Sequence, residues 1–211
     1  VTSLAQNLRY DDTAESREQT ADAILEQTRR ISAIVESLLA FSHGGRPRPL
    51  ARDPVDLQPA IDEAIRLVGL GRTEKHIEFR NECPQGLVVM GDPQLLQQVF
   101  VNLLSNAADA SEPGDAVTIR AQEHGDDEIV LEVIDQGQGI DPDVAERVFD
   151  PFFTTKPVGR GTGLGLPLIH SIVTEHGGHI ALGPGNGSGT TVTLRLPAAP
   201  ADAQTALESS A

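Results

Sequence analysis

The sequence has very few of the residues that build disulfide-rich or aromatic-rich structures. Its 211 residues include one cysteine, Cys83, and no tryptophan, and only 3% are aromatic. A single cysteine excludes an internal disulfide and a thiolate zinc cluster, and it suits a reducing compartment. We interpret Cys83 as a partly buried residue. Because hydrophobic residues still make up 39% of the chain, we expect a core that is mainly aliphatic.

Basic residues are also scarce. Sixteen Lys and Arg residues face 31 Asp and Glu residues, which gives a formal net charge of -15. Such a field repels phosphate backbones and anionic lipid head groups, so we expect no nucleic acid partner. A nucleotide is not excluded, because backbone N–H groups, a lysine and a divalent cation can hold a small anion inside an acidic protein.

Long apolar runs are missing as well. No stretch approaches the roughly 20 consecutive apolar residues that a membrane-spanning helix needs, and the first residues lack a signal-peptide pattern. We therefore expect a soluble, cytoplasmic piece, with any membrane attachment supplied by segments upstream of it.

The first part of the chain has the pattern of a helical bundle. Ile24, Ile31 and Leu38 recur at seven-residue spacing in a helical run that ends before Gly44 and Gly45. Either this helix folds onto the main domain, or it belongs to a helical hairpin that pairs with a second copy of the chain. The Pro-containing segment that follows favours the hairpin. We assign residues 1–45 to a hairpin, 46–55 to a linker, and 198–211 to a disordered tail with little to bury.

Residues 56–197 have the pattern of one mixed domain. Its order, with strands that we expect to be joined by tight turns, predicts an α+β fold in which helices cover one face of a sheet as a two-layer sandwich. The expected helices span 57–70, 92–110 and 166–176, and the expected strands span 77–81, 87–90, 116–122, 128–135, 179–182 and 190–196.

The helix over 92–110 carries two amides on one face. Asn102 and Asn106 are four residues apart, while Leu103 and Ala107 can face the core. A carboxamide oxygen is a hard ligand that suits Mg²⁺. Two asparagines on a helix are weak evidence alone.

A carboxylate follows the strand that precedes residue 136. In Asp135-Gln136-Gly137-Gln138-Gly139-Ile140, the carboxylate of Asp135 can accept a hydrogen bond from the exocyclic amine of adenine. Gly137 and Gly139 allow the backbone to turn sharply and to approach a base. An ordinary Asp-x-Gly turn is the alternative reading of this segment by itself.

Two further segments complete the pattern. Residues 148–156 contain Phe149, Phe152 and Phe153, which we expect to anchor a long loop on the core, and end at Lys156, a cation able to reach phosphates. Residues 159–166 form a glycine run that leads directly into a helix, an arrangement suited to binding a triphosphate. The run matches neither a Walker A motif nor a dinucleotide-binding fingerprint.

Taken in this order, the four segments resemble the N box, first glycine box, F box and second glycine box of the GHKL superfamily, and specifically of sensor histidine kinases. Residues 187–191 resemble the last glycine element, and the resemblance covers 56–197. It implies that Asn106 coordinates Mg²⁺ and that Asp135 contacts adenine. It also implies that Asn102 and Lys156 act in catalysis. The implied ATP-binding set is Asn102, Asn106, Asp109, Asp135, Gly137, Gly139, Ile140, Phe149, Lys156, Arg160, Gly161, Thr162, Gly163, Leu164, Gly165, Leu166 and Thr190.

The resemblance also implies a reaction. ATP-hydrolysing GHKL proteins usually carry a glutamate four residues before the metal-binding asparagine, and Asn102 stands there in this chain. Without that base, attack by water should be poor. The implied activity is transfer of the terminal phosphate of ATP to a histidine, for relay to an aspartate of a response regulator. The implied assembly is a homodimer formed through the hairpin.

The acceptor of such a reaction is not recognisable in the sequence. Histidine kinases carry it in a His-Glu box on the first hairpin helix, and no His-Glu pair occurs here. We expect a fragment cut just past that box, and a natural protein without an acceptor is the alternative. In either case the chain should not phosphorylate itself. His43 is placed wrongly to be the acceptor, and we expect His170, His176 and His179 to be surface residues rather than zinc ligands.

Two other functions remain open from the sequence. One is a non-catalytic module that binds ATP and dimerises. The other is a serine kinase of the anti-sigma-factor type, which the hairpin argues against because those kinases usually lack one.

Overall fold

The computed structural model describes residues 20, 51–70, 76–125, 127–156, 161–185 and 189–208. They belong to two units, one of residues 48–150 and 166–211 and one of residues 1–47 and 151–165, and each is described by itself. The predicted hairpin over 1–45 lies outside the described residues except for Thr20, and so does the first half of the predicted linker.

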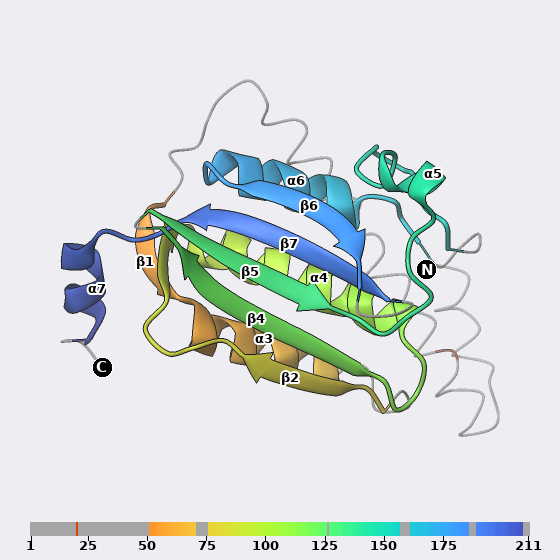
Figure 1. Cartoon of the computed structure of the whole chain (residues 1–211), viewed down its shortest axis with the longest axis horizontal. Helices are drawn as coiled ribbons and strands as arrows, with labels where there is room; N and C mark the ends of the chain where they lie inside the picture. Colours follow the sequence, from red (N-terminus) through yellow and green to blue (C-terminus); the bar gives the residue numbers. More distant parts are fainter. Residues whose placement is uncertain are drawn as a thin grey trace. The chain divides into compact units, whose positions relative to one another are not determined.

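The larger unit has a five-stranded mixed sheet with helices on one face (Figure 1). The strand order is β2-β4-β5-β7-β6. Figure 1 shows the helices behind the strands, which confirms the predicted two-layer α+β sandwich. The strands are β2 Glu78–Glu82, β4 Ala116–His124, β5 Glu128–Ile134, β6 His179–Pro184 and β7 Thr190–Pro197, and the covering helices are α3 Leu57–Leu70, α4 Pro93–Ala110 and α6 Gly165–Glu175.

The connections differ from the expected tight turns at two places, and the β5-to-β6 connection runs through α5 Pro142–Ala145 and α6. β4 and β5 form the predicted antiparallel hairpin, but β2 and β4 pair in parallel. A parallel pair needs a crossover, and here β3 Val88–Gly91 and α4 supply it. β3 does not join the large sheet, because it pairs antiparallel with β1 Asp53–Asp56. The predicted linker over 46–55 therefore ends in a strand, and the folded unit begins before residue 56.

Local sequence signals explain where α4 begins and ends. The Asp92 side chain accepts hydrogen bonds from the backbone N–H groups of Gln94 and Leu95, and Pro93 takes the first helical position. At the other end, the backbone N–H and the hydroxyl of Ser111 both donate to the carbonyl of Ala107, at 3.1 and 2.8 Å. Both ends of this helix are thus satisfied by neighbouring polar groups.

The core between the helices and the sheet is aliphatic, as predicted. Phe100 is the only phenylalanine among the buried core residues of the described chain, and Cys83 is buried at its edge. Alternate residues of the strands point into this core. Its most fully buried side chains include Leu57, Ile61, Leu96, Leu103, Leu104, Ile119, Ile129, Leu131, Ile169, Leu194 and Leu196.

The prediction of a disordered tail over 198–211 is wrong for most of its length. Ala199 is buried and its N–H donates to the carbonyl of Val88 at 2.8 Å, so the chain after β7 continues along β3. A helix follows, α7 Ala201–Glu208, and the Gln204 side chain donates to the Ala199 carbonyl at 2.9 Å. Small apolar residues and backbone hydrogen bonds order this segment despite its polar composition.

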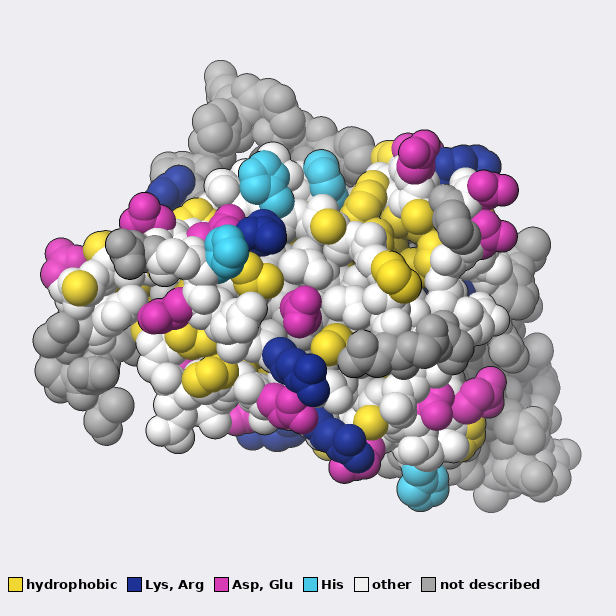
Figure 2. Space-filling view, in the orientation of Figure 1, with side chains coloured by type: hydrophobic (Ala, Val, Ile, Leu, Met, Phe, Trp, Pro, Cys, Tyr) yellow, Lys and Arg dark blue, Asp and Glu magenta, His cyan; other side chains and the backbone are white. Residues whose placement is uncertain are grey.

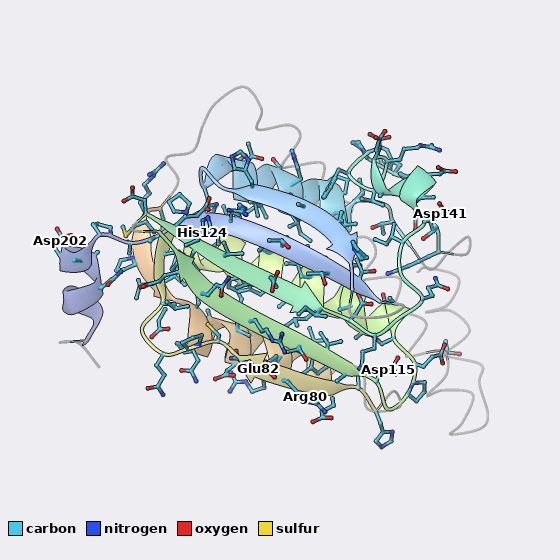
Figure 3. All side chains as sticks on the ribbon, in the orientation of Figure 1. Arg80, Glu82, Asp115, His124, Asp141 and Asp202 are labelled. Carbon is cyan, nitrogen blue, oxygen red and sulfur yellow. The ribbon has the colours of Figure 1, made fainter. Side chains whose placement is uncertain are left out.

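The other face of the large sheet is polar. Arg120 of β4 pairs with Glu82 of the edge strand β2 at 2.8 Å, and Arg80 pairs with Glu78 (Figure 3). Figure 2 shows basic side chains next to acidic ones over these strands. In the described residues, no helix is both long enough and apolar enough to cross a bilayer.

Candidate functional site

The last two turns of α4 carry a row of residues that begins with Asn102 and contains two amides. Asn102, Asn106 and Ala110 are spaced four residues apart, so they lie along one face, with about 6 Å of axial rise per step. Both asparagines are half-buried, whereas Leu103 and Ala107 are buried in the core. The helix thus brings two amides to the rim of the core, one turn and two turns before its end.

Asp135 follows directly after β5 and is 5% exposed. Its Oδ1 atom accepts hydrogen bonds from the backbone N–H of Gly137 at 2.9 Å and of Thr190 at 3.0 Å. The backbone N–H of Asp135 donates in turn to the carbonyl of Thr190 at 2.9 Å. The carboxylate is therefore fixed by its own loop and by the start of β7.

The charge state of Asp135 is set by opposing effects. Burial raises the pKa of this carboxyl, the hydrogen bonds from Thr190 and Gly137 act against that, and the charge of Asp115 raises it further. Asp115 precedes β4 at the end of the sheet where β5 ends (Figure 3). In the described part of the chain both hydrogen bonds to the carboxylate go to Oδ1, which leaves Oδ2 as the acceptor for a ligand.

Close backbone contacts join this loop to α4. A Cβ atom on Gly137 would lie 2.3 Å from the carbonyl oxygen of Ala110, so only glycine fits there. Since Ala110 is the last residue of the row that contains Asn102 and Asn106, the loop after Asp135 lies at the end of that row. The structure therefore brings Asp135, Gly137 and Thr190 together at the C-terminal end of α4.

Two residues that are absent from the predicted ATP-binding set hold the loop. A Cβ atom on Gly189 would lie 1.8 Å from the carbonyl oxygen of Asp135, so the chain entering β7 packs directly on the Asp135 peptide. The Gln136 side chain accepts a hydrogen bond from the N–H of Ala116 at 2.8 Å. Gly189 lies in the glycine element over 187–191, but no sequence signal distinguishes Gln136 from a solvent-facing glutamine.

The other residues of the predicted ATP-binding set in this unit are not tied to Asp135 by a described contact. Gly139 has a positive φ of 76°, as a sharp turn requires. Ile140, Phe149 and Leu166 are half-buried, and Asp109 is exposed on α4. The Phe149 ring lies 5.4 Å from the ring of His170, at an interplanar angle of 49°.

Residues 151–156 and 161–165 belong to the other unit, and a backbone contact joins the two segments. The N–H of Phe152 donates to the carbonyl of Gly163 at 2.8 Å, and a Cβ atom on Gly163 would lie 2.3 Å from the Phe152 carbonyl carbon. Phe152 has a positive φ of 68° and is 69% exposed, so it does not anchor the loop as expected. The left-handed backbone conformation of Phe152 explains this exposure, because it directs the ring to solvent.

Short polar contacts shape the rest of the loop. The N–H of Lys156 donates to Oγ1 of Thr154, and the N–H of Leu164 donates to Oγ1 of Thr162, at 3.2 and 3.4 Å. Gly161 has no room for a side chain, since a Cβ atom would lie 2.4 Å from the Thr154 hydroxyl. Arg160 lies outside the described residues.

The histidines near the end of α6 are not all at the surface. His170 and His179 are exposed, as expected, but His176 is 3% exposed and the expectation is wrong for it. Both of its ring nitrogens have backbone partners, so its burial carries no unsatisfied polar atom.

Comparison with known proteins identifies the family. The profile of the histidine kinase-, DNA gyrase B-, and HSP90-like ATPases matches residues 91–200. The chain belongs to this ATPase family. The matched residues contain α4 with its two asparagines, the loop after Asp135 and the glycine run that leads into α6.

Individual relatives of this ATPase domain are sensor histidine kinases. The sensor histidine kinase ZraS of Escherichia coli (strain K12) is 35% identical over 180 residues, which cover 85% of this chain and 37% of ZraS. The mycobacterial sensor histidine kinase MprB superposes with a TM-score of 0.65 at 33% identity, over 71% of this chain and 99% of that structure. Full-length ShkA, solved in complex with AMPPNP, gives a TM-score of 0.74 at 26% identity, over 92% of this chain and 41% of ShkA. The chain thus spans well under half the length of ZraS and has the ATP-binding catalytic core of sensor histidine kinases.

Proposed function

We propose that this catalytic core transfers the terminal phosphate of ATP to a histidine, from which it passes to an aspartate of a response regulator. The observation that carries the proposal is the burial and hydrogen bonding of the Asp135 side chain. Its carboxylate is buried, two backbone N–H groups saturate Oδ1, and Oδ2 is left to accept a hydrogen bond. The exocyclic amine of adenine is the donor that we assign to Oδ2.

The row on α4 supports a metal-bound phosphate chain beyond the adenine. No group of three or more His, Cys, Asp and Glu side chains in the described residues could hold a metal ion alone. Mg²⁺ takes most of its ligands from phosphates and water, so one or two neutral amide oxygens can complete its coordination. A metal that needs several protein ligands would fit this site less well. We assign Asn106 to the ion, which would neutralise charge on the phosphates.

Asn102, one helical turn before Asn106, bears on which group accepts the phosphate. Asn102 carries no carboxylate, and an amide is no base at neutral pH, so Asn102 cannot activate water by removing its proton. We assign to Asn102 the orientation of the phosphate chain. A terminal phosphate that water attacks poorly is retained for a protein nucleophile such as a histidine.

The glycine run supports phosphate binding by its sequence. Residues 161–165 lead into α6, and free backbone N–H groups at a helix N-terminus favour an anion. We assign the phosphates to this run, and to Lys156 and Arg160 as cations that offset the developing charge. Asp109, Gly139, Ile140, Phe149 and Leu166 remain assigned to the walls of the ATP site.

The partners follow from the same proposal. Sensor histidine kinase relatives support a response regulator receiver domain as the partner and dimerisation through the hairpin over 1–45.

Two measurements on the same preparation test this function. Fluorescent ATP binding is measured with the unmodified chain, with Asp135→Asn, and with Asp127→Asn, an exposed control residue at the opposite end of β5. Labelled ATP is then added together with a separately made hairpin that carries a His-Glu box. We expect binding by the unmodified chain and the control, and acid-labile label on the hairpin.

The other outcomes point to other functions. Nucleotide binding without any transfer to the hairpin would indicate a non-catalytic module. Acid-stable label on a serine would indicate a kinase of the anti-sigma-factor type. Loss of binding in Asp127→Asn but not in Asp135→Asn would contradict the assignment of the adenine site.

A further inference from the structure

His176 links the two helices that flank the proposed ATP site. It follows α6 directly, and its ring is buried at 3% exposure. Its Nδ1 atom lies 2.7 Å from the carbonyl oxygen of Ile172, four residues earlier in α6. Its Nε2 atom accepts a hydrogen bond of 3.0 Å from the backbone N–H of Asp92, the N-cap of α4.

These two contacts define the state of the ring. A backbone N–H can only donate, so Nε2 must present its lone pair to Asp92. A carbonyl can only accept, so the proton must sit on Nδ1 and point to Ile172. The two contacts therefore assign the donor role to Nδ1 and the acceptor role to Nε2.

The ring also fills a space that is closed from several sides. A Cβ atom on Gly91 would lie 2.6 Å from Cδ2 and 2.8 Å from Nε2 of His176, so glycine is needed next to the ring. After the ring, Gly177 has a φ of 77° and the N–H of Gly178 donates to Val173 at 2.9 Å, which ends α6. The side chain is thus held in one position by packing and by hydrogen bonds.

The two bonds differ in what they hold. The Ile172 carbonyl also accepts from the backbone N–H of His176 at 3.1 Å, so the Nδ1 bond adds to a carbonyl already paired within α6 and orients the ring. The N–H of Asp92 precedes α4 and has no partner within that helix. The Nε2 bond therefore joins the end of α6 to the start of α4.

We propose that His176 is a positioning residue for nucleotide binding. α4 carries Asn102 and Asn106, and α6 begins at Gly165, where the glycine run ends. Helices are stiff, so an axial shift of α6 at His176 also moves its first turn. This role rests on the proposed ATP site, and it adds a residue at the far end of both helices.

Two amide variants separate the two hydrogen bonds. The Gln side chain in His176→Gln can place an acceptor where Nε2 lies, whereas the Asn side chain in His176→Asn can place a donor where Nδ1 lies. Binding of fluorescent Mg-ADP is measured at a temperature where circular dichroism shows each variant folded. His179→Asn, an exposed residue three positions later, is the matched control.

We expect His176→Ala and His176→Asn to bind Mg-ADP about tenfold more weakly, a loss of about 1.4 kcal/mol. His176→Gln should stay within about twofold of the unmodified chain, because it keeps the acceptor for Asp92. The amide proton of Asp92 should move upfield in the first two variants and stay in place in His176→Gln. A merely structural role would lower stability in all three variants without this order of affinities.

The outcomes separate this proposal from the proposed function. If the unmodified chain does not bind Mg-ADP, the proposed ATP site falls. If the unmodified chain binds and the folded His176 variants all bind equally well, or His176→Asn binds better than His176→Gln, the positioning role is overturned.

A measurement without substitutions covers the case in which the variants do not fold. Hydrogen exchange at the Asp92 amide is followed in the unmodified chain with and without saturating Mg-ADP. If nucleotide holds α4 and α6 together through His176, exchange at Asp92 slows more than exchange at the Leu57 amide, which donates to the Leu87 carbonyl at 2.9 Å at the start of α3. Equal slowing at both amides would overturn the proposal.

Discussion

The backbone N–H of Thr190 donates to Oδ1 of Asp135 at 3.0 Å, while its carbonyl accepts from the N–H of Asp135 at 2.9 Å. The two residues are far apart in sequence: Asp135 directly follows β5, and Thr190 begins the adjacent strand β7. This reciprocal contact fixes the carboxylate before any ligand arrives. A pre-oriented acceptor costs less entropy on binding than one that must be ordered by the ligand.

Asp135→Asn should separate binding from folding. Asparagine keeps the Oδ1 acceptor for Gly137 and Thr190 but replaces Oδ2 with an NH₂ donor, which opposes the amine of adenine. We expect ATP affinity to fall by roughly a hundredfold, since an unsatisfied buried pair costs about 1 to 3 kcal/mol. The thermal midpoint should be unchanged or higher, because a buried charge is removed. Calorimetric titration with ATP and thermal unfolding check both expectations.

The pH dependence of stability should report the same carboxyl. Burial raises the pKa of Asp135 in the folded chain, so the folded state favours the protonated form. The contribution of Asp135 to the free energy of unfolding is then fully present below the ordinary aspartate pKa and is lost as pH rises through the raised value. Urea unfolding at a series of pH values, compared between the unmodified chain and Asp135→Asn, measures it. A difference that grows in favour of the unmodified chain as pH rises would contradict this sign.

Gly137→Ala should damage the contact between the Asp135 loop and α4. Its Cβ atom would lie 2.3 Å from the Ala110 carbonyl oxygen, so backbone must move. We expect a loss of about 1 to 3 kcal/mol in the free energy of unfolding, typical of overpacking, together with weaker ATP binding. Gly183→Ala is the matched control, because nothing lies within 4 Å of a Cβ atom there. Equal free energies of unfolding for the two variants would show that the Asp135 loop can move away from α4 at no cost in stability.

Most of the fold follows from local signals in the sequence. Asp92 and Pro93 predict the start of α4, and alternating β-branched residues predict the hairpin of β4 and β5. The parallel pairing of β2 with β4 is different, because nothing local tells a strand which neighbour it will join. The pairing of β1 with β3 is non-local in the same way, and so a segment that has the composition of a linker is a strand.

The sequence allows the types of residue in the site to be predicted, but not the contacts between them. The spacing of Asn102 and Asn106 places both on one face, and Asp135 ends a strand. The roles of Gly189 and His176 depend on backbone groups distant in sequence, the carbonyl of Asp135 and the N–H of Asp92. Composition around His176 suggested a surface residue, because adjacent glycines are typical of exposed turns.

Asn106→Ala should remove the part of ATP affinity that depends on Mg²⁺. Titration of ATP with Mg²⁺ and with a chelator gives the ratio of the two affinities for each chain. We expect this ratio to fall by about tenfold in Asn106→Ala, or about 1.4 kcal/mol, while affinity in chelator changes little. Gln94→Ala removes an exposed amide from the first turn of the same helix and serves as control. An unchanged ratio in Asn106→Ala would place the ion elsewhere.

Cys83 should be inert in the folded chain and reactive after unfolding. Burial first, and then the charges of Asp56 and Asp62, raise the pKa of its thiol to about 11. Only the thiolate reacts, so at pH 8 alkylation by iodoacetamide should be roughly a few hundredfold slower than in an unfolded chain with a thiol pKa near 8.5. Mass spectrometry of samples quenched with and without urea measures the two rates. Fast native alkylation would mean that the segment after β2, which contains Cys83, opens locally. Slow native alkylation makes Cys83 an internal reporter of unfolding, against which the stabilities of Asp135→Asn and Gly137→Ala can be measured without ATP.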